Sequence, residues 1–461
     1  MRLDDHPTVV AYRRGQKTPV NEDTLDADWL RDLCLSCGAD DVGFVSVSSP
    51  EIAAYRGEVA ALMPKAKSLI SLTCRMTREP VISPVRSVAN HEFHETYASV
   101  NHAARKIVQT LREHGVLALN SVAAFPMEAG DFPNKNWPIS HKPIAVAAGI
   151  GHVGLHRNLI HPEFGNFILL DTILLRNEIS EDTQPLDFDP CLDCKLCVAA
   201  CPVDAIGQDG SFNFSACYTH NYRDFLGGFV DWVDQVVESE DADDYRTRIT
   251  EGETVAMWQS LSFKPDYKAA YCISVCPAGT DVIGAFLDDR ISYNKEIIQP
   301  LKDKAETVYV LPGSDAENSV AKRFPNKKPK RVSWTVTAPN IYSFLFNLTL
   351  TFQKMKSKGV LLACNLVLTG DAPVNASLTI GDRKLEVGFS HVETPDLTVH
   401  ADQTLWMTSF ELDFDLERAL SSKAIKVEGS EYDYRTLVSC FIKYGRVPSA
   451  FLPEDEPEPV G

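Results

Sequence analysis

The stretch that decides the fold is a cysteine run at the centre of the chain, Cys191-Leu-Asp-Cys194-Lys-Leu-Cys197-Val-Ala-Ala-Cys201-Pro202. In a run with this spacing, the first three thiolates reach one iron–sulfur cluster, and the fourth cysteine begins a helix that carries it to a second cluster. Thiolates are soft ligands that suit zinc and iron–sulfur clusters alike, but this four-cysteine spacing is far more typical of [4Fe–4S]. The run therefore predicts a module that holds two clusters.

A second cysteine group follows and ends in Cys272-Ile-Ser-Val-Cys276-Pro277. In the bacterial ferredoxin pattern, the last cysteine of each run crosses to the other cluster. The first cluster is therefore expected to use Cys191, Cys194, Cys197 and Cys276. The second is expected to use Cys201, Cys217 and Cys272. A usual second run has a further cysteine three residues before Cys272, where this chain has Ala269, so the second cluster is either [3Fe–4S] or [4Fe–4S] with a non-cysteine ligand.

Length and composition set the scale around this module. The chain has 461 residues, which corresponds to about three domains at roughly 150 residues each. Hydrophobic residues make up 44% and charged residues 23%, so most of the chain is expected to be folded. The formal net charge of −18 argues against a broad surface for phosphate backbones, and we expect no nucleic-acid partner.

The compartment follows from what the sequence does not contain. We expect a cytoplasmic protein without a membrane span, because no stretch of about 18 apolar residues occurs and no apolar segment follows Arg13-Arg14. Cytosolic thiols stay reduced, so dense cysteines there indicate metal binding or catalysis rather than disulfides. Cys34 and Cys37 form a C-x-x-C pair on the apolar face of a helix expected around residues 29–37, and we interpret them as buried core residues.

The first 185 residues alternate between expected strands and helices. Strands are predicted at residues 42–47, 68–73, 116–124 and 167–175. Apolar residues at helical spacing predict a helix from Tyr97 to His114, which Gly115 ends. This order favours an α+β sheet domain in front of the cysteine module.

One stretch before the cysteines carries a resemblance. It reads Ala-Gly-Ile-Gly-His-Val-Gly-Leu-His-Arg-Asn-Leu-Ile-His-Pro-Glu-Phe-Gly over residues 148–165. Followed by the ferredoxin run, it resembles the cobalamin-dependent iron–sulfur reductases, which are the reductive dehalogenases and the epoxyqueuosine reductases. The resemblance covers roughly residues 20–290 and includes the spacing from Cys201 to Cys217.

The two families differ in their active sites. Epoxyqueuosine reductases carry an acidic proton donor in a Val-Asp-Thr-Ala-Pro element, where this chain has Ile139-Ser-His-Lys-Pro143, and a lysine where it has Leu155. Dehalogenases pair a tyrosine with a basic residue, which Tyr97 and Arg157 match in position. The resemblance thus implies an oxidoreductase of the soluble, catabolic reductive dehalogenase type. The alternatives are an epoxyqueuosine-reductase-like cobalamin enzyme and a non-catalytic iron–sulfur electron-transfer or lipid-binding protein.

The resemblance also implies a site. A nitroreductase-like fold would hold base-off cobalamin, and two clusters would deliver electrons to it from a separate donor such as a ferredoxin or flavodoxin reductase system. Tyr97 would protonate the carbon of an organohalide while Arg157 stabilises the phenolate; the alternatives are a packing role for Tyr97 and a corrin contact for Arg157. The expected cofactor contacts are His141, Lys142, Gly149, Gly151, His152, Gly154, Leu155 and Asn158.

The C-terminal part resembles a lipid-binding domain of the sterol-carrier-protein type, with a predicted hairpin at residues 378–387. The expected map has an α+β cobalamin-binding catalytic domain at 1–185, a ferredoxin-like iron–sulfur module at 186–300 and a basic linker at 301–332. An α/β sterol-carrier-like domain at 333–450 and an acidic tail at 451–461 follow.

Overall fold

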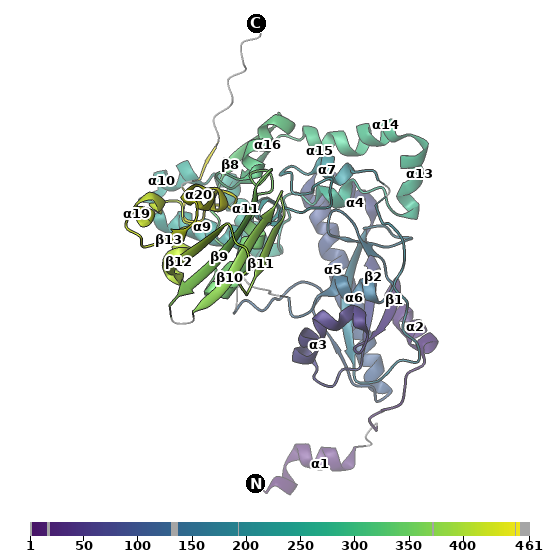
Figure 1. The fold of residues 1–461 in the computed structure, drawn as a ribbon. Helices are drawn as coiled ribbons and strands as arrows, with labels where there is room; N and C mark the ends of the chain where they lie inside the picture. Colours follow the sequence, from purple (N-terminus) through teal and green to yellow (C-terminus); the bar gives the residue numbers. More distant parts are fainter. Residues whose placement is uncertain are drawn as a thin grey trace.

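A computed structural model describes residues 2–15, 19–130, 137–191, 193–370, 373–447 and 449–451. Helices and strands are mixed throughout, as expected for an α+β protein. Two larger sheets lie apart from each other, and the helices between residues 196 and 323 occupy much of the remaining space (Figure 1). No helix within the described ranges is long and apolar enough to cross a membrane.

The first sheet has the order β1-β2-β6-β3, and every pairing in it is antiparallel. Its strands are β1 (Asp41–Ser46), β2 (Ser68–Arg75), β3 (Ala118–Asn120) and β6 (Ile168–Leu175). All residues of β2 except the last are buried, which requires cover on both faces of the sheet. The strand expected at 116–124 shortens to three residues, and the other expected strands are confirmed.

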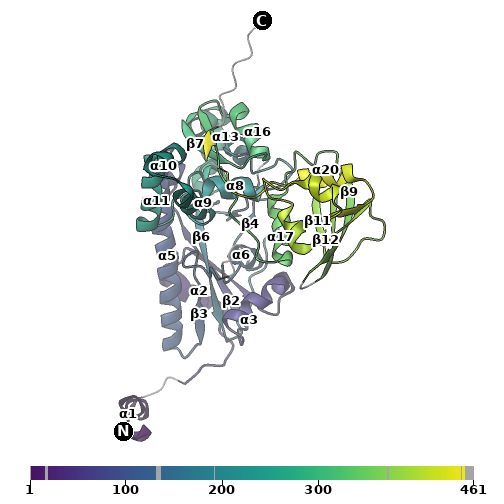
Figure 2. The same cartoon turned by 90° about the vertical axis from the view of Figure 1, so that its left-hand side faces the viewer.

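Helices supply that cover. α2 (Ala27–Ser36) and α5 (Arg86–Glu113) pack on one face, and α3 (Arg56–Leu62) and α6 (His141–Ala147) pack on the other. α5 runs the length of the sheet (Figure 2). It begins eleven residues before Tyr97, so this tyrosine lies in the middle of the helix rather than at its start.

Short helices follow the first domain. They are α7 (Leu196–Ala200), α8 (Phe214–Asn221), α9 (Gly227–Glu238), α10 (Ala242–Arg248), α11 (Glu251–Phe263), α12 (Tyr271–Ser274), α13 (Thr280–Asp288), α14 (Arg290–Tyr293) and α15 (Gln299–Asp303). α7, α8 and α12 carry or adjoin the cluster cysteines, and α9 to α11 form an insertion between Cys217 and Cys272.

Residues 301–332 are not the linker that their composition indicates. They fold into β7 (Glu306–Val310), α16 (Asp315–Arg323) and β8 (Lys327–Arg331), and the two strands pair in parallel. Lys327 and Lys330 are only 3% and 2% exposed, and they form ion pairs of 2.6 Å with Glu306 and 2.7 Å with Glu253. The carboxylates that neutralise these lysines lie on other elements, so they cannot be identified from the charges of the neighbouring sequence alone.

The C-terminal sheet has the order β11-β10-β9-β12-β13. Its strands are β9 (Leu361–Thr369), β10 (Val374–Gly381), β11 (Leu385–Gly388), β12 (Leu397–Asp402) and β13 (Lys426–Glu428). β10 and β11 form the expected hairpin, whose turn holds Asp382 and Arg383 at positive φ. Helices α17 (Ile341–Thr351), α18 (Gln403–Thr408), α19 (Leu416–Ser421) and α20 (Glu431–Ser439) accompany the sheet. The sterol-carrier resemblance and the domain boundaries stay predictions.

The last residues return to the middle of the protein. β14 (Ala450–Phe451) pairs antiparallel with β8 and completes a sheet of order β14-β8-β7. The rest of the expected acidic tail, residues 452–461, lies outside the described residues.

Candidate functional site

The seven cysteines of the module separate into the two groups that their spacing predicts. Four of them line one small pocket: Cys191, Cys194, Cys197 and Cys276. The other three line the wall of a much larger cavity: Cys201, Cys217 and Cys272. All twelve cysteines of the chain are free, so no disulfide competes for these thiols.

In each cysteine group, a backbone N–H donates a hydrogen bond to a sulfur and so favours its negatively charged thiolate. Leu155 N–H donates to Cys191 Sγ at 3.2 Å, and Ala205 N–H donates to Cys201 Sγ at 3.3 Å. Hydrogen bonds of this kind to cluster sulfurs tune iron–sulfur potentials. Gly154 makes the first contact possible, because a Cβ there would lie 2.7 Å from Ile160 Cδ1 and 3.4 Å from Cys191 Sγ.

The thiols need a bound cation to ionise. Burial raises the pKa of Cys272 and of Cys276 to about 12, so both are neutral at pH 7 in the absence of metal. A metal centre supplies the positive charge that reverses this preference. No group of three or more His, Cys, Asp or Glu side chains in the described part of the chain is arranged around a single ion. The spacing of the two cysteine groups is that of iron–sulfur cluster ligands.

The large cavity lies where the three parts of the chain meet. Its volume is about 1120 Å³, above the roughly 300–1,000 Å³ of ordinary small-molecule pockets. Its wall includes Tyr97 of α5, the start of α6, residues 156–159, and Thr349 and Leu350 of α17. The cavity is therefore large enough for a bulky cofactor together with a substrate.

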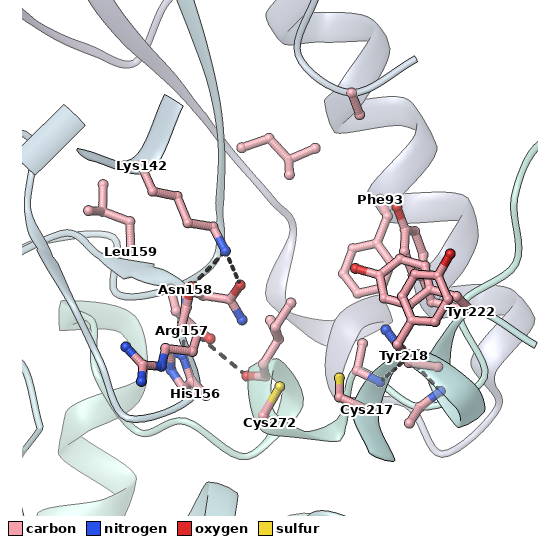
Figure 3. Close-up of a pocket in the computed structure, with 18 of the residues that line it drawn as sticks. Phe93, Lys142, His156, Arg157, Asn158, Leu159, Cys217, Tyr218, Tyr222 and Cys272 are labelled. Carbon is pink, nitrogen blue, oxygen red and sulfur yellow. Dashed lines mark hydrogen bonds between the residues drawn. The ribbon is translucent and has the colours of Figure 1, made fainter. Parts of the chain in front are cut away.

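Lys142 brings a positive charge into this cavity. Its Nζ donates to the Arg157 carbonyl oxygen at 2.6 Å and to Asn158 Oδ1 at 3.2 Å (Figure 3). Burial within the cavity wall lowers the pKa of Lys142, while neighbouring Cys272 and Cys217 oppose that shift. Lys142 thus links α6 to the segment around Arg157.

Tyr97 and Arg157 both line the cavity, but they have separate partners. The Tyr97 hydroxyl donates to the Phe125 carbonyl oxygen and accepts from the Phe125 N–H at 3.2 Å. The exposed Arg157 guanidinium donates to the Gly210 carbonyl oxygen at 3.3 Å, and Arg157 itself adopts a positive φ of 64°. The expected tyrosine–arginine pair therefore stays a prediction.

The expected cofactor contacts divide into two sets. His141, Lys142 and Asn158 line the cavity. His141 is held there by Thr172 Oγ1 at 2.9 Å and the Val122 carbonyl oxygen at 3.0 Å. The residues outside the described cavity lining are Gly149, Gly151, His152, Gly154 and Leu155.

Gly149 and Gly151 lie close to neighbouring backbone, and their expected contact with a cofactor stays a prediction. A Cβ on Gly149 would lie 2.4 Å from the Gln184 carbonyl oxygen, and one on Gly151 would lie 2.3 Å from that of Ile160. His152 pairs with Ile160 in the short ribbon of β4 (His152–Val153) and β5 (Leu159–Ile160). Which part of the chain packs against each glycine depends on tertiary structure, and the local glycine pattern does not show it.

Three functional candidates were missed in the sequence. His156 Nε2, Asn166 Oδ1 and His220 Nε2 are buried polar atoms in residues that line the cavity, and none has a hydrogen-bond partner among the described residues. Buried polar groups are nearly always hydrogen-bonded, so these atoms call for a bound group. Burial lowers the pKa of His156 to about 4 and keeps its ring neutral at pH 7. The missing hydrogen-bond partners of these three side chains can be recognised only from the folded structure.

An aromatic wall completes the cavity opposite Lys142. Tyr222 and Tyr267 line the cavity with ring centroids 5.7 Å apart, and Phe93 joins them through Tyr267 at 6.0 Å. Phe225 is outside the described cavity lining and contacts both tyrosine rings, at 5.0 and 5.3 Å. Tyr218, Tyr222 and Phe225 are spaced like one face of a helix, which is the one signal for this wall in the sequence.

Comparisons with known proteins match this picture in part. Residues 185–207 match the 4Fe-4S binding domain family. Epoxyqueuosine reductase of Cellulophaga algicola is 24% identical over 242 residues, which are 46% of this chain and 75% of that protein. Epoxyqueuosine reductase of Cyclobacterium marinum is 25% identical over 232 residues, 43% of this chain and 70% of that protein. That of Synechococcus sp. is 39% identical over 76 residues, 15% of this chain and 22% of that protein.

Solved structures of both families share parts of the fold. An epoxyqueuosine reductase with an epoxyqueuosine-modified tRNA stem loop has a TM-score of 0.29 at 18% identity and covers 42% of this chain. A catabolic reductive dehalogenase with 3-bromo-4-hydroxybenzoic acid has a TM-score of 0.37 at 16% identity and covers 59% of this chain. The chain spans 56% and 35% of these two structures, respectively.

Two expectations are affected by these findings. The expected reductive dehalogenase is wrong, because the sequence relatives that match are named epoxyqueuosine reductases. These relatives lend no support to an organohalide substrate or to the expected absence of a nucleic-acid partner. The chain thus contains a match to a 4Fe-4S binding domain, and the relatives named above are reductases.

Proposed function

We propose that this protein is a corrinoid-dependent iron–sulfur reductase related to the epoxyqueuosine reductases, and that it reduces its substrate in the large cavity. The observation that carries this proposal is the opening of the second cysteine group into the same cavity as Lys142. Electrons held at that group would reach a bound cofactor without crossing another layer of protein.

The cavity residues fit a corrinoid. Its volume exceeds that of an ordinary pocket, its wall is largely apolar and aromatic, and three buried polar atoms in it lack partners. When bound, the corrinoid supplies cobalt-centred reduction, which amino-acid side chains cannot perform. Asn166, His156 and His220 would hydrogen-bond its polar edge, and the aromatic wall would exclude water.

Lys142 lies two residues after Ser140, which stands where epoxyqueuosine reductases carry their acidic proton donor. Its Nζ has three donors, of which two are used by Arg157 and Asn158, so one N–H remains to face a ligand. Lys142 would hold a proton at Nζ next to the reacting group. Tyr97 would instead position the 123–126 segment through both hydrogen bonds to Phe125.

The first experiment measures iron and corrinoid in anaerobically prepared protein, with EPR of the cobalt. We expect seven or eight irons, about as many as two clusters hold, and one cobalt per chain. Reduced protein is then incubated with epoxyqueuosine-containing tRNA, and queuosine formation is measured. Iron without corrinoid after reconstitution would refute the proposal and favour an electron carrier or lipid-binding protein. Corrinoid binding without queuosine would retain the reductase and reject that substrate.

A further inference from the structure

We propose that the protein leaves one corner of its second cluster without a side-chain ligand, at Ala269, and that this corner faces the large cavity. An iron at that corner would be exchangeable, unlike the irons of the first cluster. The inference rests on the proposed function only in requiring iron–sulfur clusters at the two cysteine groups. It requires neither the corrinoid nor a particular substrate.

The position of Ala269 carries the argument. Ala269 lines the cavity together with Cys201, Cys217 and Cys272, and it stands three residues before Cys272, where a second ferredoxin run has its cysteine. Its side chain is a methyl group and cannot bind iron. The described part of the chain thus offers four thiols in the small pocket and three at the cavity wall.

Asn221 is not free to replace the missing thiolate. Its Oδ1 accepts from the N–H groups of Ala269 and Ala270, both at 3.0 Å. These bonds hold the backbone in the turn before α12 and occupy the amide oxygen. The turn is thus built as if for a ligand at position 269, but with no donor atom on the side chain.

Two other polar side chains of the cavity are also committed. Lys142 Nζ is bonded to Arg157 and Asn158, and a protonated amine has no lone pair for iron. His220 accepts the Tyr309 N–H at Nδ1 at 3.4 Å, so its neutral ring carries the proton on Nε2. A protonated Nε2 has no lone pair for iron, so it would donate a hydrogen bond to a bound group rather than bind iron.

The chemical consequence is a reversible loss of one iron. With a one-electron oxidant such as ferricyanide, the balance is [4Fe–4S]2+ → [3Fe–4S]+ + Fe2+ + e−, and the electron reduces the oxidant. Ferrous iron and one electron from dithionite restore the cluster. The group with Cys276 has four thiolates and is expected to resist this treatment.

The experiment treats the purified, anaerobic holoprotein with one equivalent of ferricyanide and then with 57Fe2+ and dithionite. The wild type should show the EPR signal of an oxidised [3Fe–4S] cluster and then take up about one 57Fe per chain. Ala269→Cys should retain its iron, lack that signal and take up almost no 57Fe. Ala124→Cys, which adds a thiol elsewhere on the cavity wall, should behave like the wild type.

Two results would overturn the inference. One is a wild-type protein that keeps all its iron and shows no three-iron signal, especially if His220→Ala then produces that signal. The other is an Ala269→Cys variant that loses iron as the wild type does. If Ala269→Cys does not fold, the wild type alone still tests the inference: uptake of about one 57Fe per chain supports it, and no uptake refutes it. Because these readouts are independent of corrinoid and tRNA, failure of the proposed function leaves them intact.

Discussion

At the residue scale, one lysine holds two segments of the cavity wall together. Lys142 joins α6 to the 156–159 segment through the Arg157 carbonyl and the Asn158 amide. A hydrogen bond to a charged group contributes about 1.5–3 kcal/mol, and loss of the donor leaves its acceptors unpaired. The charge and the position of this segment are therefore lost together when the lysine is replaced.

We predict that Lys142→Met weakens corrinoid binding by roughly tenfold or more, which corresponds to about 1.4 kcal/mol per factor of ten. The reason is that methionine keeps the length of the side chain and removes its donors. Anaerobic titration with cob(II)alamin, followed by absorbance, measures the affinity. Lys264→Met is the matched control, because Lys264 also lines the cavity and lies in a different segment. Equal losses in both variants would assign the effect to net charge alone.

At the element scale, α11 is fixed to the rest of the protein by its first turn. Thr250 and Glu253 form a capping box, and Glu253 Oε2 also accepts from the buried Lys330 Nζ of β8 at 2.7 Å. Removing one partner of a buried ion pair is strongly destabilising, because the other charge remains in a medium of low dielectric constant.

We predict that Glu253→Gln lowers the stability of the fold by about 3–5 kcal/mol, because Lys330 is left without a counter-charge. Urea unfolding, followed by circular dichroism of the reconstituted protein, measures the change. Glu251→Gln alters an exposed residue of the same turn and should change stability by less than about 0.5 kcal/mol. A Glu253→Gln variant as stable as this control would contradict the pairing.

The same pair predicts a pH dependence. Burial opposes ionisation of Glu253, but the Lys330 ammonium and the Thr250 N–H outweigh it and hold the pKa of this carboxyl below its ordinary value. A carboxyl with a lowered folded-state pKa stabilises the fold above its unfolded pKa of about 4.3 and loses this effect as pH falls through the folded pKa. The difference in thermal midpoint between wild type and Glu253→Gln should thus be constant from pH 7 to about 5 and shrink below about 4. A difference that grows on acidification would refute this assignment.

At the scale of the whole molecule, the clusters would join segments that are distant in sequence. The first pocket brings Cys191 to Cys197 together with Cys276, and the second joins Cys201 and Cys217 to Cys272. The insertion α9 to α11 lies between the last two of these cysteines. Each cluster thus acts as a cross-link that closes a long loop, which disfavours the unfolded chain.

We predict that removing iron with a chelator under reducing conditions makes the segment between residues 186 and 300 the first to be cleaved in limited proteolysis. The buried thiols would then be neutral and without a common partner. Mass spectrometry of the fragments locates the cuts, and protein reconstituted with iron and sulfide provides the control. Identical cleavage patterns with and without iron would mean that packing alone maintains this module.

The sequence predicts this molecule best where the information is local. The cysteine spacing assigns the seven thiols to two groups, and the structure gathers them in those groups because a short loop fixes where each thiol can reach. Lys142, His141 and Asn158 line the cavity, and their contact with a cofactor stays a prediction. The close approach of Gly149 and Gly151 to other backbone could not be predicted, because tertiary contacts decide what a bare backbone faces. The basic linker expected at 301–332 instead forms strands and a helix, because Glu253 and Glu306 on other elements neutralise its buried lysines.

The position of α17 at the edge of the cavity has a thermodynamic consequence. Thr349 and Leu350 share the cavity wall with Tyr97 and the cysteines, so a ligand that fills the space touches all three parts of the chain at once. By linkage, such a ligand stabilises every contact that forms its site, in proportion to its concentration over its dissociation constant. Slower amide hydrogen exchange in α17, far along the chain from the cluster cysteines, would therefore report occupancy of the cavity.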